Sequence, residues 1–269
     1  MAAATERNVK VDGLNVRYLE EGRGKPVILL HGAALGSSSD VWQRHLSPLA
    51  STGLRALAYD RPGYGRTDDA PNDSAGYQQQ FVLRFMDALG IDSAGLVGHS
   101  ATGNYAVQLG LDHPDRVSKL MIIGTGGLMP PLEGQSLGPP AGDAVYGREP
   151  TREEVREVLE SQLYDHSIIT PEILETRYQM SLGHVKAGPP VAPATGGAPR
   201  TPLWQRLGEL RMPIMLLYGK DDRGSVRERE PLFRQRYPNI DLRMIDNCKH
   251  LLQLDAEAEF LAAAKEFFA

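Results

Sequence analysis

The sequence predicts an α/β protein in which a mainly parallel central sheet is flanked by helices. Short apolar runs bounded by turn residues recur along the chain, as in strands that are buried on both faces. Helical patterns separate most of these runs, and such alternation is typical of a parallel sheet covered by helices. The 269 residues, 41% of them hydrophobic, can form one large domain or one domain with an insertion.

The first expected elements form a hairpin over residues 8–19, because Asp12-Gly13 separates two runs of alternating side chains. The run "PVILLHG" at 26–32 is the first strand expected to be buried on both faces. Further strands, with the turns that follow them, are expected at 55–63, 94–100, 118–126, 213–222 and 241–250, and helices are expected at 77–89 and 103–112.

Residues 126–205 interrupt this alternation, because no apolar strand occurs among them. One helix is expected after Thr151, since Glu154 follows at the spacing of a capping box. A second is expected after Thr170, where Pro171 occupies the first helical position.

The chain is therefore predicted to have an α/β core, residues 1–125 and 206–269, and a small helical cap inserted at 126–205. Such a cap would lie over the carboxyl ends of the strands, where open α/β sheets bind ligands. The alternative is a flexible loop that contains two helices by chance.

The composition argues against several classes of function. The net charge is −5 without long runs of like charge, which does not favour binding to nucleic acid or to an anionic membrane. The first residues lack the features of a signal peptide, and no run approaches the roughly 18 apolar residues that span a bilayer. The single cysteine, Cys248, cannot form an internal disulfide. A cytoplasmic protein with a small-molecule partner is expected.

Ser100 is the candidate nucleophile, because it lies between an apolar strand pattern and a helical pattern in Gly98-His99-Ser100-Ala101-Thr102. A sharp strand-to-helix turn would project its hydroxyl from the end of the sheet, at a helix N-terminus. Thr102 stands where the G-x-S-x-G pattern has its last glycine, and its β-branched side chain would crowd the turn. Gly103, the next residue, is expected to relieve this crowding. The alternative is a serine that only caps the next helix.

A serine hydroxyl needs a base, and the base needs an orienting acid. His250 follows the last expected strand and is the candidate base. Asp222 and Asp221 both follow the strand before it, and from the residues alone the two are equal candidates for the acid. The order Ser, Asp, His is the one expected for a G-x-S-x-G nucleophile in an α/β sheet.

The other histidines are assigned structural places. His99 is expected to pack or hydrogen-bond in the turn beside Ser100, and His31 is expected to steady the loop after the first buried strand. No two histidines are spaced i, i+4 on one helix, so a histidine metal site is not expected. The remaining histidines are expected at the surface: His45, His113, His166 and His184.

An oxyanion hole requires two backbone N–H donors. One is expected from Ala101, the residue after the nucleophile. The other is expected from Ala33, with Ala34 as the next candidate, in the loop "HGAALGSSSDVW". The alternative is an ordinary loop of small residues.

Five motifs, "VILLHG", "YDRPGYGRTD", "LVGHSATGN", "LYGKDDR" and "NCKHLLQLDAEAEF", together resemble the α/β-hydrolase superfamily over nearly the whole chain. The resemblance implies the α/β-hydrolase fold and a triad of Ser100, His250 and Asp222, with Asp222 preferred to Asp221. It places the oxyanion hole at the amides of Ala33 and Ala101. The sequence contains no nucleotide, metal or flavin motif, and triad chemistry requires none, so no cofactor is expected. A serine at this turn argues against the haloalkane dehalogenase and epoxide hydrolase branches.

The segment "YDHSIITPEILETRYQMS" resembles the cap of the meta-cleavage product hydrolases, which cut a carbon–carbon bond in vinylogous 1,5-diketone acids. This resemblance implies that Arg177 binds the carboxylate or dienolate of the substrate. A planar, permanently charged guanidinium suits that task. The alternative is a solvated helix residue, although Glu172 and Glu175 do not have the spacing that helix ion pairs need.

Other activities are compatible with the same motifs. "YDRPGYGRTD" resembles a stretch found in many esterases and lactonases, so a carboxylesterase or lactonase is the alternative. A small-molecule receptor that retains the triad is a third hypothesis. A homodimer is left open.

Overall fold

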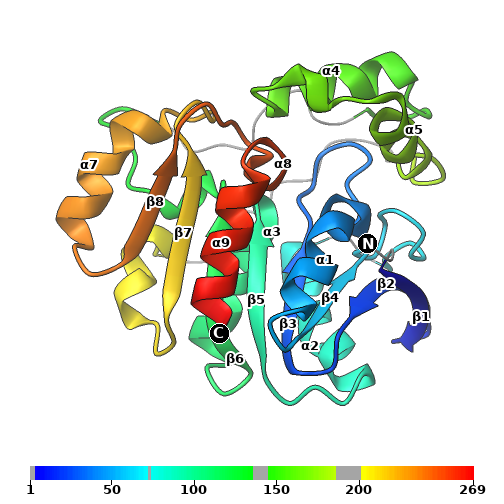
Figure 1. Ribbon diagram of the computed structural model, residues 1–269, viewed down its shortest axis with the longest axis horizontal. Coiled ribbons are helices and arrows are strands. Elements are labelled where there is room, and N and C mark those ends of the chain that lie inside the picture. The colour runs from blue at the N-terminus through cyan, green and yellow to red at the C-terminus, as the bar shows by residue number, and fades with distance from the viewer. Residues whose placement is uncertain (1–3, 72–73, 136–144, 186–200) are drawn as a thin grey trace, which may run out of the picture.

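The computed structural model contains one eight-stranded sheet with helices on both faces (Figure 1). The strand order is β1-β2-β4-β3-β5-β6-β7-β8; the pairs β1–β2 and β2–β4 are antiparallel and the other pairs are parallel. The predicted α/β class with a mainly parallel sheet is therefore confirmed. The structure describes residues 4–71, 74–135, 145–185 and 201–269. The strands are β1 (Thr5–Val11), β2 (Leu14–Glu21), β3 (Lys25–Leu30), β4 (Leu54–Tyr59), β5 (Ala94–His99), β6 (Val117–Ile123), β7 (Ile214–Gly219) and β8 (Asp241–Ile245).

Two apolar cores lie on the two faces of this sheet, because successive strand residues point to opposite sides. In β5, Leu96 packs into one core and Val97 into the other. Figure 1 shows α1 and α9 in front of the sheet, and their side chains fill the core that contains Val97. This face is covered by α1 (Gln43–Ala50) and α9 (Glu257–Phe268). The other face is covered by α2 (Ala75–Ala88), α3 (Ala101–Asp112) and α7 (Val226–Arg236).

The first hairpin turns where the sequence predicts it. Asp12 and Gly13 have φ of 51° and 82°, the left-handed conformations that a two-residue hairpin turn requires. Asparagine, aspartate and glycine adopt this region most readily, which explains why this dipeptide joins β1 to β2.

Between β6 and β7 the chain forms α4 (Arg152–Gln162) and α5 (Pro171–Gln179), which lie beyond the end of the sheet where β7 and β8 terminate (Figure 1). The expected caps are present: Thr151 and Glu154 form a capping box, and the Thr170 hydroxyl accepts from the N–H of Ile173. Residues 136–144 and 186–200 of the predicted cap lie outside the described residues, and the division into core and cap stays a prediction. The remaining α-helices in the described residues are short: α6 (Leu203–Arg206) and α8 (Leu252–Asp255).

The two inserted helices share a small apolar cluster with the core. Leu159 of α4 and Leu174 of α5 pack in one cluster with Leu251, the residue after His250. The N–H of Leu251 also donates to the carbonyl of Gln162 at 2.9 Å. The inserted helices are thus attached directly to the loop that carries the candidate base.

The prediction that His45 lies at the surface is wrong. His45 is fully buried, and its ring packs edge-on against Phe260 at 5.0 Å between centroids. Burial lowers the pKa of its imidazole, so the ring is neutral, and its Nε2 lies 2.8 Å from the Gln253 carbonyl. His45 has polar neighbours in the sequence, which give no sign that this side of α1 packs against Phe260 of α9. His166 is exposed, and His113 and His184 are half-buried.

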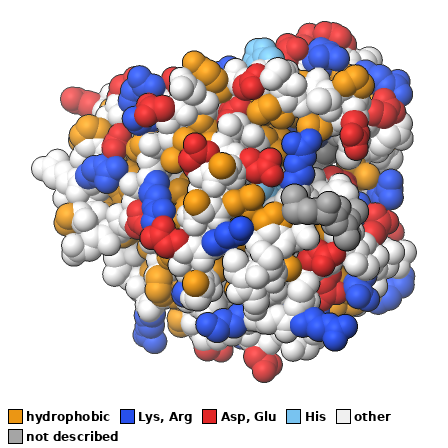
Figure 2. Space-filling view, in the orientation of Figure 1, with side chains coloured by type: hydrophobic (Ala, Val, Ile, Leu, Met, Phe, Trp, Pro, Cys, Tyr) orange, Lys and Arg blue, Asp and Glu red, His pale blue; other side chains and the backbone are white. Residues whose placement is uncertain are grey.

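Charges of both signs are interspersed on the face drawn in Figure 2, as the lack of like-charge runs in the sequence predicts. No helix within the described ranges is long and apolar enough to cross a membrane.

Candidate active site

Ser100 occupies a strained turn between β5 and α3. Its φ of 59° lies in a region that non-glycine residues adopt at a cost of about 1–3 kcal/mol. The backbone is fixed there, because the N–H of Ser100 donates to the Ile123 carbonyl and its own carbonyl accepts from Thr125 Oγ1 at 2.8 Å. The Ser100 side chain makes no capping hydrogen bond to α3. The alternative of a serine that only caps the helix is therefore wrong.

Glycines allow this turn to close. A Cβ on Gly98 would lie 2.7 Å from the Cα of Gly103, and a Cβ on Gly103 would lie 2.0 Å from Thr125 Oγ1. Thr102 is tolerated because its side chain points into the sheet, where its hydroxyl lies 3.1 Å from the carbonyl of Leu30. The turn thus requires a glycine at 103 rather than at 102.

Asp222 and His250 meet where β7 and β8 end. Nδ1 of His250 lies 3.1 Å from both carboxylate oxygens of Asp222, and the two side chains are 6% and 3% exposed. Asp221 instead pairs with Arg227 at 3.0 Å on the surface. Of the two aspartates that the residues alone leave equal, the structure places Asp222 beside the imidazole.

The other ring nitrogen of His250 is available for chemistry. Its Nε2 is buried and has no hydrogen-bond partner among the described residues. A carboxylate at Nδ1 favours the tautomer with the proton on Nδ1, which leaves the Nε2 lone pair free to accept a proton. The geometry is that of a general base oriented by an acid.

His99 packs and hydrogen-bonds beside Ser100, as expected, and its partner there is the loop that carries the candidate base His250. Its ring lies 4.9 Å from that of His250 between centroids, and its Nε2 lies 2.9 Å from the His250 carbonyl. Burial lowers the pKa of His99, and the neighbouring His250 lowers it further, so the ring is neutral and Nε2 donates. His99 directly precedes Ser100, so this contact holds the loop after β8, which carries His250, against the end of β5.

The loop after β3 passes directly beside Ser100. A Cβ on Gly32 would lie 3.3 Å from the Cβ of Ser100 and 3.1 Å from Nδ1 of His99. The predicted oxyanion donors flank this contact: Ala33 follows Gly32, and Ala101 is the first residue of α3. Their assignment as an oxyanion hole stays a prediction that this proximity supports.

Arg177 is not a solvated helix residue. Only 8% of it is exposed, and its Nε donates to the Leu35 carbonyl at 2.7 Å, with Nη2 3.3 Å from Ser37 Oγ. A Cβ on Gly36 would lie 2.2 Å from the Arg177 carbonyl, so α5 is pressed against this loop. Whether Arg177 also binds a substrate anion stays a prediction.

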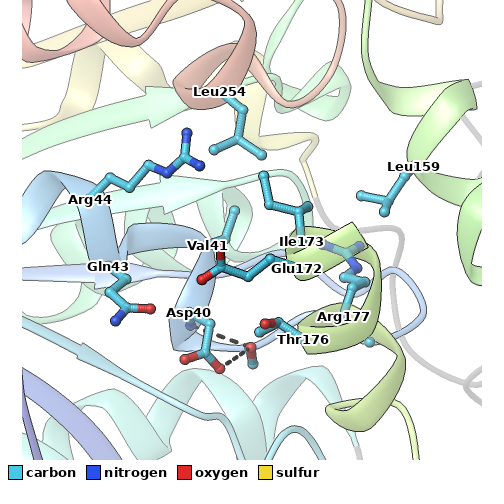
Figure 3. Close-up of a pocket in the computed structure, with 12 residues that line it drawn as sticks. Asp40, Val41, Gln43, Arg44, Leu159, Glu172, Ile173, Thr176, Arg177 and Leu254 are labelled. Atoms are coloured by element: carbon cyan, nitrogen blue, oxygen red, sulfur yellow. Dashed lines mark hydrogen bonds between the residues drawn. The ribbon is translucent and has the colours of Figure 1, made fainter. Parts of the chain in front are cut away.

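Arg177 also borders a pocket of about 120 Å³ between α5, α1 and α8 (Figure 3). Charged residues Asp40, Arg44 and Glu172 line it together with apolar residues such as Ile173. Ser100, Asp222 and His250 are not among its lining residues. This pocket is therefore separate from the candidate triad. Within the described ranges, no group of three or more histidine, cysteine, aspartate or glutamate side chains could hold a metal ion.

Three buried histidines predict a loss of stability in mild acid. Burial is the main cause that lowers the pKa of His31, His45 and His99 below 6.5 in the folded protein. Below about pH 6.5 the unfolded chain therefore binds more protons than the folded chain, and the free energy of unfolding falls as the pH falls. The slope is up to about 1.4 kcal/mol per pH unit for each histidine.

Urea unfolding measured between about pH 7.5 and pH 5.5 checks this, because carboxyl groups titrate mostly below that range. We expect His45→Gln to show a smaller slope than the wild type, since one of the three titrating groups is gone. A free energy of unfolding that stays constant over this range would contradict the prediction.

Comparisons with known proteins identify the family. The sequence profile of the α/β hydrolase fold matches residues 25–158. The 2-hydroxy-6-oxononadienedioate/2-hydroxy-6-oxononatrienedioate hydrolase of Burkholderia vietnamiensis is 31% identical, over 97% of this chain and 93% of its own length. A solved meta-cleavage product hydrolase from Pseudomonas fluorescens IP01 has a TM-score of 0.76 at 24% identity and covers 97% of both chains.

A solved N-acyl homoserine lactone degrading enzyme, Est816, is also similar, with a TM-score of 0.70 at 27% identity over 97% of this chain and 100% of its own. The chain belongs to the α/β-hydrolase superfamily.

Proposed function

We propose that this protein is a serine hydrolase whose triad is Ser100, His250 and Asp222. One observation carries the proposal: a buried imidazole, oriented by a carboxylate and with a free Nε2, lies at the end of the sheet where a strained serine begins a helix. A buried aspartate–histidine pair has no evident structural need for an unpaired nitrogen, whereas general-base catalysis requires one.

In this mechanism Nε2 of His250 accepts the proton of the Ser100 hydroxyl as its oxygen attacks a substrate carbonyl. The negative charge that develops on the carbonyl oxygen is stabilised by the N–H groups of Ala33 and Ala101 and by the N-terminus of α3. Asp222 stabilises the imidazolium, which then protonates the leaving group. Water, activated by the same imidazole, hydrolyses the acyl-enzyme.

The substrate that we propose is a 2-hydroxy-6-oxo-dienoate acid, in which hydrolysis cleaves a carbon–carbon bond. Support comes from the Burkholderia vietnamiensis relative at 31% identity over nearly the full chain, which is named as a hydrolase of such acids. Arg177, on the inserted helix α5, is proposed to attract the carboxylate or dienolate of this substrate. For this bond, direct activation of water by His250 is an alternative to attack by Ser100.

A carboxylesterase or lactonase is the second candidate. The structural similarity to the N-acyl homoserine lactone degrading enzyme at 27% identity favours it. The triad and the oxyanion donors would act in the same way, but the leaving group would be an alkoxide instead of a carbanion.

A comparison of substrates tests the proposal. We expect the purified protein to bleach a coloured 2-hydroxy-6-oxo-6-aryl-dienoate rapidly and to hydrolyse 4-nitrophenyl acetate and a homoserine lactone slowly. The opposite preference would replace carbon–carbon cleavage by the ester or lactone reaction. Slow single-turnover hydrolysis of all three substrates would instead indicate a receptor that retains the triad.

A further inference from the structure

The carbonyl of Gly32, directly before the proposed oxyanion donor Ala33, is held by two side chains. Nη2 of Arg61 donates to it at 2.8 Å, and Nδ1 of His31 lies 2.8 Å from it. Arg61 reaches this point from the loop that follows β4, and it is only 2% exposed.

The tautomer of His31 is fixed by its surroundings. The backbone N–H of Arg61 donates to Nε2 of His31 at 3.0 Å, so Nε2 is an acceptor. Burial lowers the pKa of His31 and the charge of Arg61 lowers it further, so the ring carries one proton. That proton is therefore on Nδ1, and it is donated to the Gly32 carbonyl.

Two donors on this carbonyl determine where the next N–H points. In a trans peptide the carbonyl of Gly32 and the N–H of Ala33 belong to one plane and point in opposite directions. Because the carbonyl faces Arg61 and His31, the N–H of Ala33 faces away from them. Gly32 lies against Ser100, so this N–H is presented near the nucleophile.

The charge of Arg61 also strengthens the donor. A guanidinium that binds a carbonyl polarises the whole peptide group, which makes its N–H a better donor. None of the carboxylates in the described residues forms an ion pair with Arg61, so its charge is not neutralised by a direct contact. Its guanidinium lies over the ring of Tyr64 at 4.3 Å, which limits its movement.

We propose that Arg61 is a positioning residue that sets and polarises the Gly32–Ala33 peptide, so that the oxyanion hole is formed before substrate binds. This inference rests on the proposed serine-hydrolase function. Loss of the Arg61 contact leaves Ser100, His250 and Asp222 in place, but the Gly32 carbonyl then keeps the neutral donor of His31 without the charged one, so the peptide is less firmly held and less polarised. The substitution should therefore weaken the stabilisation of the negative charge that develops during the reaction, and it should leave the binding of the neutral ester unchanged.

The test uses 4-nitrophenyl acetate as substrate and phenylboronic acid as inhibitor, because a boronate on Ser100 places a negatively charged oxygen in the hole. Losing a whole oxyanion donor costs about 100- to 1,000-fold, and misplacing one should cost about 10- to 100-fold. We expect Arg61→Met to lower kcat/KM and to raise the inhibition constant of phenylboronic acid by the same factor. Arg61→Lys, which keeps a charged donor, should recover part of both.

Arg66→Met is the matched control, since Arg66 lies on the same loop with a side chain that is 59% exposed. It should leave both constants unchanged, and thermal midpoints show which variants remain folded. Wild-type values in Arg61→Met would overturn the inference, as would a loss of kcat/KM without weaker boronate binding. If Arg61→Met does not fold, the same two constants in Arg61→Lys decide.

The outcomes also separate this inference from the proposed function. If phenylboronic acid does not inhibit the wild type and Ser100→Ala stays active, the proposed serine chemistry itself is wrong. If the wild type is inhibited and depends on Ser100, but Arg61→Met behaves as the wild type, only the role of Arg61 is wrong.

Discussion

Ser100→Ala is expected to lower kcat/KM for 4-nitrophenyl acetate by about four to six orders of magnitude, the loss seen when a serine hydrolase loses its nucleophile. The residue has no other evident task, because its hydroxyl makes no capping bond to α3 and its backbone is held by Ile123 and Thr125. The fold should therefore survive the substitution. Stopped-flow or steady-state release of 4-nitrophenolate measures the loss.

Ser51→Ala is the control for this substitution, since it removes an exposed hydroxyl at the end of α1. It should retain full activity, and both variants should unfold at nearly the wild-type temperature. If folded Ser100→Ala kept wild-type activity, Ser100 would not be the nucleophile.

Asp222→Asn is expected to lower kcat/KM by about three to four orders of magnitude. The carboxylate now accepts the Nδ1 proton of His250 at 3.1 Å, whereas an amide can present its N–H and turn the imidazole into the other tautomer. Nε2 would then carry the proton and could no longer act as the base. The loss should appear at every pH at which the folded protein is stable.

The adjacent residue supplies the matched control. Asp221 carries the same charge, but it pairs with Arg227 at the surface and does not touch the imidazole. Asp221→Asn should change kcat/KM by less than about threefold, because exposed ion pairs contribute little. Equal losses in the two variants would show that net charge matters, and not the contact with His250.

The sheet was predictable because buried parallel strands leave continuous apolar runs such as Val27–Leu30. The caps at Thr151 and Thr170 were predictable because capping depends on residues only three positions apart. The burial of His45 was not, since it depends on Trp42 and Phe260, and Phe260 comes from the far end of the chain.

The candidate site, like the fold, could be predicted only in part. The order of Ser100, Asp222 and His250 and their places after strands could be read from the sequence. The choice of Asp222 over Asp221 came from the family resemblance and not from the residues themselves, because neighbouring residues differ only in the direction in which the backbone points them. Arg61 was missed because its main partner is a backbone carbonyl, which leaves no complementary residue type in the sequence.

Labelling with a fluorophosphonate, followed by peptide mass spectrometry, tests the central claim that His250 activates the hydroxyl of Ser100. We expect one adduct on the peptide that contains Ser100, none on that peptide in Ser100→Ala, and labelling slowed by orders of magnitude in His250→Ala. A wild-type protein that stays unlabelled at Ser100, or that reacts equally fast without His250, would contradict the claim.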